Sequence, residues 1–551
     1  MRRKQRGHRA CRHRGRGAAD VNSANADRGT LSRRASLQRL KQTNRFDLLV
    51  VGGGATGLGV ALEAATRGLS VAVVERDDFA KGTSSRATKL VHGGVRYLAQ
   101  GNVALVKEAL RERKAILENA PHLAQPLPCL VPAFGMKGRL WDRLFYGTGL
   151  MLYDLLAGKA GLGETRFLNR AETIGTMPGV RAQDLVGSVK YWDGQFDDAR
   201  LAVALARTAA SYGAVVLNHC PAAALLHTDG KVSGASVTNA ETGESIDVHA
   251  HCIVNATGVW VDDLRRMDLN PDSHMVSPSQ GIHLVVDREF LPGDHALLVP
   301  KTDDGRVMFA VPWLGKVLLG TTDTPRDMIE SEPTPLADEV DFILGEAAKY
   351  LARIPSASDV RSIWGGVRPL VRPPDAEPGN TKDISREHLV LVDKSGLVSV
   401  TGGKWTTYRA MAEDVVERCT AAGLLAPRES SRTIDLRLIG TPTTASHKIS
   451  DPPGAHLYGT EAALLDDLPG HQRELGMGLT EAMVRFAVRH EAAMTVEDVL
   501  ARRSRILFLD AQLAGALADD VAAIIADELG REVVDLAGFK QLAQRYRTLP
   551  E

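Results

Sequence analysis

No long apolar run occurs in this sequence of 551 residues. A membrane-spanning helix needs about eighteen or more consecutive apolar residues, and no segment approaches that length. Any contact with a membrane must therefore be peripheral. Aromatic residues are also few, at 5%, which weighs against a protein whose main task is to bind nucleic acid.

Cysteine is scarce as well. The cysteines are widely spaced and form no CxxC pair; they are Cys11, Cys129, Cys220, Cys252 and Cys419. This spacing argues against a zinc site, an iron–sulfur cluster and a disulfide framework. We therefore expect a reducing compartment and no bound metal.

The formal net charge is zero, but the charge is distributed unevenly. Residues 1–44 contain thirteen Lys or Arg against Asp20 and Asp27, which leaves an acidic remainder. Because the opening residues are almost devoid of apolar side chains, we expect residues 1–44 to form a disordered basic tail. An organelle transit peptide and an arm that contacts nucleic acid or anionic lipid remain alternatives. A plain solvated extension or an upstream start codon is the simpler interpretation.

The composition that is present, 44% apolar and 24% charged residues, is that of a soluble globular protein. The length exceeds what one ordinary hydrophobic core can organise. We therefore expect two domains, or one large fold with an appendage.

The first strongly patterned segment is FDLLVVGGGATGLGVALEAATRGLSVAVVE, residues 46–75. It predicts a strand, a glycine turn, a helix and a second strand, which together make a βαβ unit. Gly52, Gly54 and Gly57 satisfy the pattern GxGxxG, and Glu75 ends the second strand. In this context the glycines let a pyrophosphate approach the helix N-terminus, and Glu75 can accept hydrogen bonds from ribose hydroxyls. NAD and FAD both use this arrangement, so the unit alone leaves the cofactor open.

Two later segments favour FAD. IVNATGVW, residues 253–260, contains Thr257 and Gly258 and is similar to the strand and turn that return to the dinucleotide in glutathione-reductase-like FAD enzymes. GGKWTTY, residues 402–408, contains Gly403 and Thr406. It predicts a glycine turn that enters a helix, whose N–H groups would face the flavin pyrimidine edge.

Periodicity indicates how the rest of the chain is organised. Helices are expected over residues 103–119, 198–212 and 406–422, and short alternating runs between 185 and 326 predict a mostly antiparallel sheet. Prolines, serines and threonines are frequent over residues 427–458, which predicts a linker, and the Ala- and Leu-rich segment after it predicts helices. The expected units are a tail (1–44), a discontinuous cofactor and substrate region (45–426), a linker (427–458) and a helical C-terminal domain (459–551).

The fold class expected from this pattern is α/β. It combines an FAD-binding Rossmann-like domain of the two-dinucleotide-fold, glutathione-reductase-like type with an antiparallel-sheet substrate domain. A helical domain completes the chain.

A collinear set of segments carries a more specific resemblance. The segments are VVGGGATGLG, GTSSRATKLVHGGVRYL, NATGVWVDDL, GIHLVVD, LLGTTDT, WGGVRPL, SREH, TGGKWTTYR and RHEAAMTVEDVLARRSR. From about residue 45 to 546 the chain thereby resembles the FAD-dependent, aerobic-type glycerol-3-phosphate dehydrogenase family. The first 44 residues have no counterpart in this pattern.

The resemblance implies an enzyme that oxidises sn-glycerol 3-phosphate to dihydroxyacetone phosphate by hydride transfer to FAD N5. It further implies that the electrons pass to a membrane quinone. The expected location is cytoplasmic, with peripheral association at the inner face of the cell membrane. A homodimer is compatible with this picture, and no nucleic-acid partner is expected.

The resemblance also implies site residues, by motif match. The substrate-binding residues would be Arg96, Tyr97, Arg368, Arg386 and Lys404. Several cations in one cleft suit a phosphate that is close to a dianion, although a lone arginine is more often a surface ion-pair partner. Further cofactor contacts would come from the loop after the βαβ unit, through Ser84, Ser85, Lys89, His92, Gly93 and Gly94.

His283, in the segment GIHLVVD, is the candidate general base because imidazole titrates near the working pH. A single strand histidine can equally be a packed or hydrogen-bonded residue. Arg368 and Lys404 could instead stabilise the alkoxide that develops during oxidation.

Two alternatives to this function stay open from the sequence. One is an oxidase of the same family, or a related amine-oxidising flavoprotein, that uses oxygen and makes peroxide. The other is a nucleic-acid-binding or scaffold protein that retains a nucleotide fold without catalysis; the low aromatic content and acidic body weigh against it.

Overall fold

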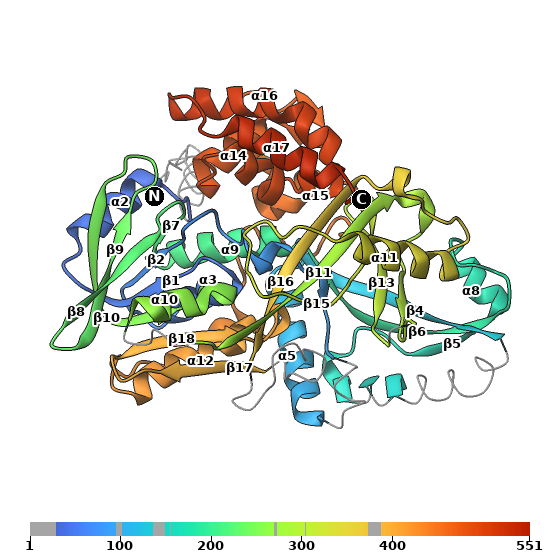
Figure 1. The fold of residues 1–551 in the computed structure, drawn as a ribbon, viewed down its shortest axis with the longest axis horizontal. Helices are drawn as coiled ribbons and strands as arrows, with labels where there is room; N and C mark the ends of the chain where they lie inside the picture. The colour runs from blue at the N-terminus through green and yellow to red at the C-terminus, as the bar shows by residue number, and fades with distance from the viewer. Residues whose placement is uncertain are drawn as a thin grey trace, which may run out of the picture.

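The computed structural model describes residues 29–94, 102–135, 149–268, 273–372 and 387–550, except positions 152, 155 and 304. Two large sheets lie side by side, and a cap of helices from the C-terminal part of the chain covers one end of both (Figure 1). Most of the described residues predicted for the site lie where the two sheets and the helices meet. Among the described helices, none combines the length and the hydropathy that a membrane crossing requires.

The first sheet is the cofactor-type sheet. Its strands run in the order β17-β18-β10-β1-β2-β7. Their bounds are His388–Val392, Leu397–Gly402, Ser245–Asn255, Phe46–Val51, Val71–Val74 and Val215–Leu217. The central pairs are parallel, β17 is antiparallel to β18, and the hairpin of β8 (Ala222–Thr228) and β9 (Lys231–Thr238) extends β10. The predicted βαβ unit is therefore the centre of this sheet.

Helices pack against this sheet and bury its short β-branched strands. They are α3 (Ala55–Thr66), α9 (Asp198–Ser211) and α12 (Tyr408–Ala421). Alanine and glycine dominate α3, and its small side chains allow close contact: a Cβ at Gly59 would lie 2.9 Å from the Tyr408 ring. The predicted helices over 198–212 and 406–422 correspond to α9 and α12, with one turn of 3-10 helix at Trp405–Thr407 before α12.

The second sheet is mostly antiparallel, as predicted for residues 185–326. Its main path runs β15-β11-β14-β13-β12-β4-β6-β3, while β16 pairs with β11 and β5 with β6. The strands that carry functional residues are β11 (Val276–Asp287), β14 (Lys316–Gly320) and β16 (Ser362–Val371). Other members are β3 (Leu90–Val91), β4 (Ala124–Phe134), β5 (Arg166–Asn169), β6 (Leu185–Phe196), β12 (Ala296–Val299), β13 (Met308–Trp313) and β15 (Thr324–Pro325). Helices α5 (Val103–Asn119), α8 (Arg170–Thr176) and α11 (Ala337–Tyr350) flank this part, and α10 (Val261–Met267) follows β10.

The C-terminal helices share a hydrophobic core with the second sheet. The helices are α13 (Ala462–Asp466), α14 (Glu481–Glu491), α15 (Ile506–Leu509), α16 (Ala511–Leu529) and α17 (Leu536–Arg547). Phe508 packs against Trp364 of β16 with ring centroids 5.1 Å apart. The same buried cluster also contains Trp313 of β13. The helical region is thus packed onto the second sheet rather than separated from it.

The segment 427–458, expected to be a linker, is irregular but packed. Leu438 and Ile449 are buried, and the Leu438 N–H donates to the Asn119 carbonyl at 2.9 Å. Proline and threonine content therefore predicts the irregular backbone correctly, but it carries no information on whether such a segment lies against the protein.

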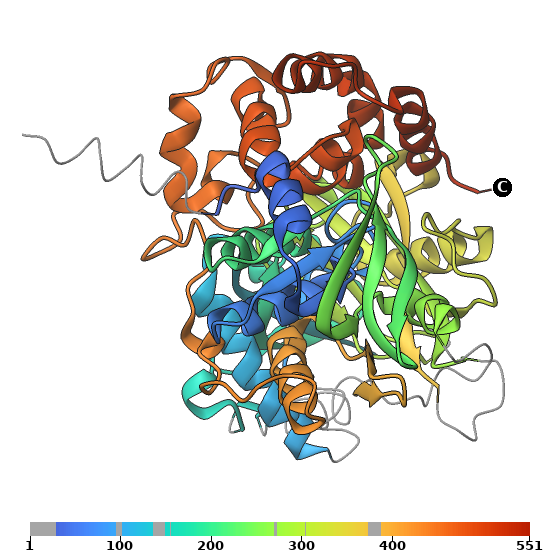
Figure 2. The same ribbon diagram turned by 90° about the vertical axis from the view of Figure 1, so that its left-hand side faces the viewer.

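The expectation of a disordered tail is wrong for residues 29–44. Residues 33–42 form helix α2 (Arg33–Gln42), capped by the Ser32 hydroxyl, and Leu40 is 1% exposed. Arg33 donates to the Asn218 carbonyl at 2.6 Å and to the Asn239 side chain at 2.6 Å. Figure 2 shows α2 between the first sheet and the C-terminal helices. A serine cap and a few apolar residues outweigh the basic composition here; residues 1–28 lie outside the described part of the chain.

Substitution Leu40→Ala should lower the free energy of unfolding by about 2–5 kcal/mol, because it removes a buried side chain from the sheet-facing side of α2. Chemical denaturation of the full chain measures this. The exposed neighbour Gln38→Ala is the matched control and should stay within about 0.5 kcal/mol of the unmutated protein. Equal stability of both variants would contradict the packing of α2.

Candidate cofactor and substrate site

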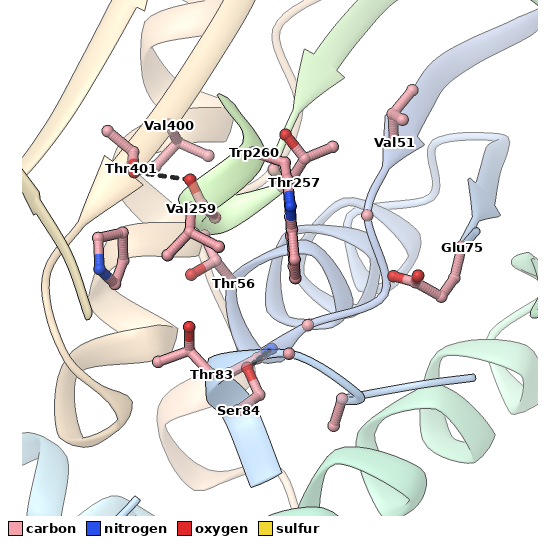
Figure 3. A pocket seen from close by; sticks show the side chains of 18 of the residues that line it. Val51, Thr56, Glu75, Thr83, Ser84, Thr257, Val259, Trp260, Val400 and Thr401 are labelled. Carbon is pink, nitrogen blue, oxygen red and sulfur yellow. Dashed lines mark hydrogen bonds between the residues drawn. The ribbon is translucent and has the colours of Figure 1, made fainter. Parts of the chain in front are cut away.

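A cavity of about 300 Å³ opens at the carboxyl ends of β1, β2 and β10. Four segments that are distant in the sequence line it: residues 51–56, 74–84, 256–267 and 400–408. Figure 3 shows side chains from all four segments around one hollow, with the Thr401 hydroxyl bonded to the Gly258 carbonyl. A volume of this size suits a small-molecule ligand, held against the ends of the first sheet's strands.

The glycines of GxGxxG are required by close backbone contacts. Gly52 has φ +112°, and a Cβ there would lie 2.5 Å from the Ala256 carbonyl oxygen. A Cβ at Gly57 would lie 1.9 Å from the Gly52 carbonyl oxygen. Gly54 stands at the N-cap of α3 and supplies no side chain to cap it. The N-terminal end of α3 therefore faces the cavity, where a pyrophosphate would find N–H groups and the positive end of the helix dipole.

Glu75 follows β2 and lies at the edge of the cavity (Figure 3). Its carboxylate accepts hydrogen bonds from the Gly53 N–H at 2.6 Å and the Asp77 N–H at 2.9 Å. Burial raises the pKa of Glu75, although these two donors oppose that shift. The fixed carboxylate retains acceptor positions for ribose hydroxyls.

A second glycine turn closes the other end of the cavity. Gly402 and Gly403 have φ +81° and +68°, and both line the cavity together with Lys404. The next residues tie this turn to the loop after the βαβ unit. The Trp405 indole N–H donates to the Ser84 carbonyl at 2.8 Å, and the Thr406 hydroxyl donates to the His92 carbonyl at 3.3 Å.

The predicted cofactor residues of the loop after the βαβ unit divide into two groups. Ser84 lines the cavity, and its hydroxyl accepts from the Ala55 N–H at 2.9 Å. Outside the cavity lining lie Ser85, Lys89, His92, Gly93 and Gly94. Lys89 is 0% exposed and pairs with Asp198 at 2.7 Å. Gly93 packs against Tyr153, since a Cβ there would lie 2.1 Å from the Tyr153 hydroxyl.

His283 and Arg368 lie on neighbouring strands of the second sheet. β11 and β16 are antiparallel, with Ser279 opposite Arg368 and His283 opposite Trp364. Because side chains alternate along a strand, His283 and Arg368 point to the same face of the sheet. Gly281 lies between them, and a Cβ there would lie 2.4 Å from Arg368 Nη2. The missing side chain at Gly281 therefore provides the space that the guanidinium occupies.

The loop after β14 fixes the guanidinium of Arg368. Arg368 pairs with the Asp323 carboxylate at 3.2 Å and donates to the Thr321 hydroxyl at 3.2 Å and to the Thr322 carbonyl at 3.0 Å. Its neighbour Pro369 lines the same cavity as Lys404. Lys404 lines the cavity, whereas Arg368 is not among the lining residues, and its side chain alternates with that of Pro369 along β16. The other predicted substrate residues, Arg96, Tyr97 and Arg386, lie outside the described residues.

His283 is almost fully buried, with 2% of its surface exposed. Its Nε2 lies 3.0 Å from the Thr88 hydroxyl, and its ring stacks on Trp364 with centroids 4.3 Å apart. Burial first, and then the charges of Lys89 and Arg368, hold the pKa of His283 well below its usual value. The imidazole is therefore neutral at physiological pH, the form that can accept a proton.

Sequence reasoning did not identify the residues that support these groups. Thr88, Asp323 and Asp198 contact His283, Arg368 and Lys89 respectively. Thr88 and Asp323 stand inside the segments GTSSRATKLVHGGVRYL and LLGTTDT, which were already distinctive. Arg76 lies over the Trp260 ring at 4.9 Å at the cavity edge. Nothing in the sequence pattern pairs any of these residues with its partner.

Comparison with known proteins is consistent with this geometry. A family model described as "FAD dependent oxidoreductase" matches residues 47–409. A second model, "C-terminal domain of alpha-glycerophosphate oxidase", matches residues 454–533. The mitochondrial glycerol-3-phosphate dehydrogenase of Bos taurus is 41% identical over 94% of this chain and 74% of its own. This chain belongs to the FAD-dependent glycerol-3-phosphate dehydrogenase family.

Further relatives of this family extend the comparison. Mitochondrial glycerol-3-phosphate dehydrogenase SDP6 of Arabidopsis thaliana is 40% identical, over 91% of this chain and 86% of its own. The solved glycerol-3-phosphate dehydrogenase of Bacillus halodurans, complexed with FAD, superposes with a TM-score of 0.74 at 28% identity. That alignment covers 94% of this chain and 99% of the other. The family assigns FAD as the cofactor, and the glycine contacts and the acidic residue around the cavity fit it.

Substitution Gly57→Ala should abolish or strongly reduce FAD binding, because the new methyl group would displace the Gly52 carbonyl and the turn that faces the pyrophosphate. The measurement is the flavin absorbance per chain after purification, repeated after incubation with excess FAD. Gly345→Ala is the matched control, since nothing lies within 4 Å of a Cβ at that helical position; it should keep full flavin content. Normal FAD content in Gly57→Ala would contradict the proposed position of the pyrophosphate.

Proposed function

We propose that this protein oxidises sn-glycerol 3-phosphate to dihydroxyacetone phosphate and passes the electrons to a membrane quinone. The observation that carries the proposal is that His283 and Arg368 share one face of the second sheet, while Lys404 lines the cavity at the carboxyl ends of the first sheet's strands. Relatives named glycerol-3-phosphate dehydrogenase, aligned over most of the chain, support the choice of substrate. They also argue against the non-catalytic scaffold alternative.

In this proposal two groups of residues hold FAD from opposite sides. The first group is Gly52, Gly54, Gly57, Glu75 and Ser84; the second is Thr257, Gly258, Gly403 and Thr406. When bound, FAD would supply the two-electron acceptor for the substrate's hydride, at its N5. His92, Gly93 and Gly94 would complete the flavin side of the site. Lys89, fully buried, is less suited to direct contact with the cofactor.

Arg368 has the geometry for a phosphate or an alkoxide. Four acceptors orient its planar guanidinium: the Asp323 carboxylate, the Thr321 hydroxyl, and the carbonyls of Thr322 and Gln280. Its fixed positive charge would attract a phosphate or an alkoxide. Lys404 adds a point charge from the first sheet. We assign Arg96, Tyr97 and Arg386 to the same substrate group by motif match alone.

His283 is proposed as the base that accepts the hydroxyl proton. Its neutral imidazole is held by Thr88 on one edge and by Trp364 on one face. Burial, Lys89 and Arg368 disfavour the protonated form, so His283 would hold the proton only weakly. Arg368 and Lys404 would at the same time stabilise the negative charge that develops on the substrate oxygen.

Substitution Arg368→Met should raise the KM for glycerol 3-phosphate by about 10–100-fold, because charge-assisted hydrogen bonds contribute roughly 1.5–3 kcal/mol. Steady-state kinetics with an artificial electron acceptor measure this. Arg361→Met, just before the same strand and paired with Asp287 at the surface, is the control and should leave KM unchanged. An unaltered KM in Arg368→Met would rule out its role in substrate binding.

An oxidase is the second candidate. The C-terminal family model carries the name of an oxidase, which favours testing oxygen as the acceptor. Glycerol 3-phosphate should bleach the flavin absorbance under anaerobic conditions with either acceptor. A soluble quinone should then restore the colour faster than air-saturated buffer, with little hydrogen peroxide formed. Rapid reoxidation by oxygen with one peroxide per substrate would assign the oxidase instead.

Peripheral membrane association at the inner face of the cell membrane belongs to the same proposal, since a quinone acceptor resides in the bilayer. A homodimer is also compatible with it. Fractionation of cells at low and high salt tests the membrane contact: protein that is entirely soluble at low salt would contradict it.

A further inference from the structure

A buried cluster of charges lies directly behind His283. Lys89 and Arg505, both 0% exposed, share the Asp198 carboxylate, which Lys89 contacts at 2.7 Å and Arg505 at 3.1 Å. Both cations also donate to the Ser85 carbonyl, each at 2.8 Å. Asp197 completes the cluster and lies 3.6 Å from Arg505. Two cations and two anions are thus enclosed between the first sheet, the second sheet and the C-terminal helices.

Lys89 is the member of this cluster nearest to the proposed base. It follows Thr88, whose hydroxyl contacts His283 Nε2. Its ammonium group lies 4.8 Å from the centre of the Trp364 ring, and His283 stacks on that same ring. The rings of Trp313 and Phe508, at 5.0 and 5.6 Å, enclose the ammonium further. Both side chains are buried, and charges interact more strongly in the protein interior than in water.

The charged groups that face His283 among the described residues are Lys89, from the loop before β3, and Arg368, from β16. Both are cations. Lys89 also pairs with Asp198 of α9, and Asp198 in turn pairs with Arg505 of the C-terminal region. Burial lowers the pKa of Lys89 to about 7, although Asp198 opposes that change. Lys89 is therefore charged under mildly acidic conditions, where an ordinary histidine would take up a proton.

We propose that Lys89 is a positioning residue whose ammonium group opposes protonation of His283 and so keeps the imidazole available to accept the substrate hydroxyl proton. The inference rests on the proposed role of His283 as the base. It assigns to the C-terminal region, through Arg505 and Phe508, the task of holding Lys89 in place. A purely structural lysine would instead only tie Ser85 to Asp198.

The test is the pH dependence of kcat/KM for glycerol 3-phosphate, measured on FAD-loaded enzyme. Substitution Lys89→Met should shift the acid limb of the profile to higher pH by about one unit, because loss of a nearby positive charge raises the pKa of the histidine. At a pH well below both limbs this lowers kcat/KM by about tenfold relative to the unmutated enzyme at the same pH. Lys89→Arg keeps the charge and should restore the original limb. The ionisation of the substrate phosphate is common to all variants and cancels in the comparison.

Two further variants protect the test against misfolding and non-specific charge effects. Lys89→Met/Asp198→Asn removes both partners of the buried pair and leaves no unmatched carboxylate; it should retain the shifted limb. Lys349→Met removes an exposed lysine that pairs with Glu346 and should leave the profile unmoved. Flavin content and thermal stability are recorded for each variant.

The outcomes separate the inference from the proposed function. Loss of activity at every pH without movement of the limb, in both Lys89→Met and the double variant, would reduce Lys89 to a structural role and overturn the inference. Full activity in His283→Asn would instead remove the proposed base, and the inference with it. A large loss in His283→Asn combined with an unmoved limb in the Lys89 variants would defeat the inference alone.

Discussion

The loop from Thr83 to His92 is the contact on which the rest of the site depends. Within this loop the Ser84 hydroxyl accepts a hydrogen bond from the first N–H of α3. The Ser85 carbonyl accepts hydrogen bonds from both Lys89 and Arg505. Thr88 then contacts His283 on the second sheet. One stretch of backbone therefore sets the entrance of the dinucleotide helix and the position of the proposed base together. A displacement of the loop at Ser84 would therefore also move Thr88 relative to His283.

Electrostatics in this region are arranged to balance buried charges locally. Asp78 after β2 is bound by Arg502 and Arg503 of the C-terminal region, and all three side chains are buried. Burial would raise the pKa of Asp78, but these arginines bring it below its usual value. A buried ion pair adds little net stability when complete and is costly when one partner is missing. Such pairs consequently fix which surfaces meet more than they strengthen the contact.

Much of the fold could be predicted from the sequence because its signals are local. The βαβ unit is encoded by a run of β-branched residues, three glycines and one acid within thirty positions, and α5 begins and ends where periodicity and Pro121 indicate. The cofactor cavity followed from the same glycines. Helix α2 was missed because an arginine-rich composition conceals a serine cap and one buried leucine. The packing of residues 427–458 was not predicted, because the residue types that favour irregular backbone are the same in exposed and in packed segments.

The site itself was predictable only in part. Motifs identify single residues, and Lys404 lines the cavity as predicted. Pairings between residues that are far apart in the chain leave no local signal in the sequence. Three such contacts arise only in the tertiary structure: Asp198 with Lys89, Thr88 with His283, and Asp323 with Arg368. The burial of Lys89 could likewise not be predicted from KLVHGG, because a lysine next to apolar residues can also face solvent.

Arg502, Arg503 and Arg505 have a consequence for how the chain is made. They supply the counter-charges of Asp78, Asp197 and Asp198, yet they leave the ribosome hundreds of residues after those carboxylates. Until these arginines have been synthesised, the carboxylates can be stabilised by hydration but not by pairing with them. Closure of the interior around these carboxylates therefore belongs to the last stage of folding, after the C-terminal helices have been synthesised.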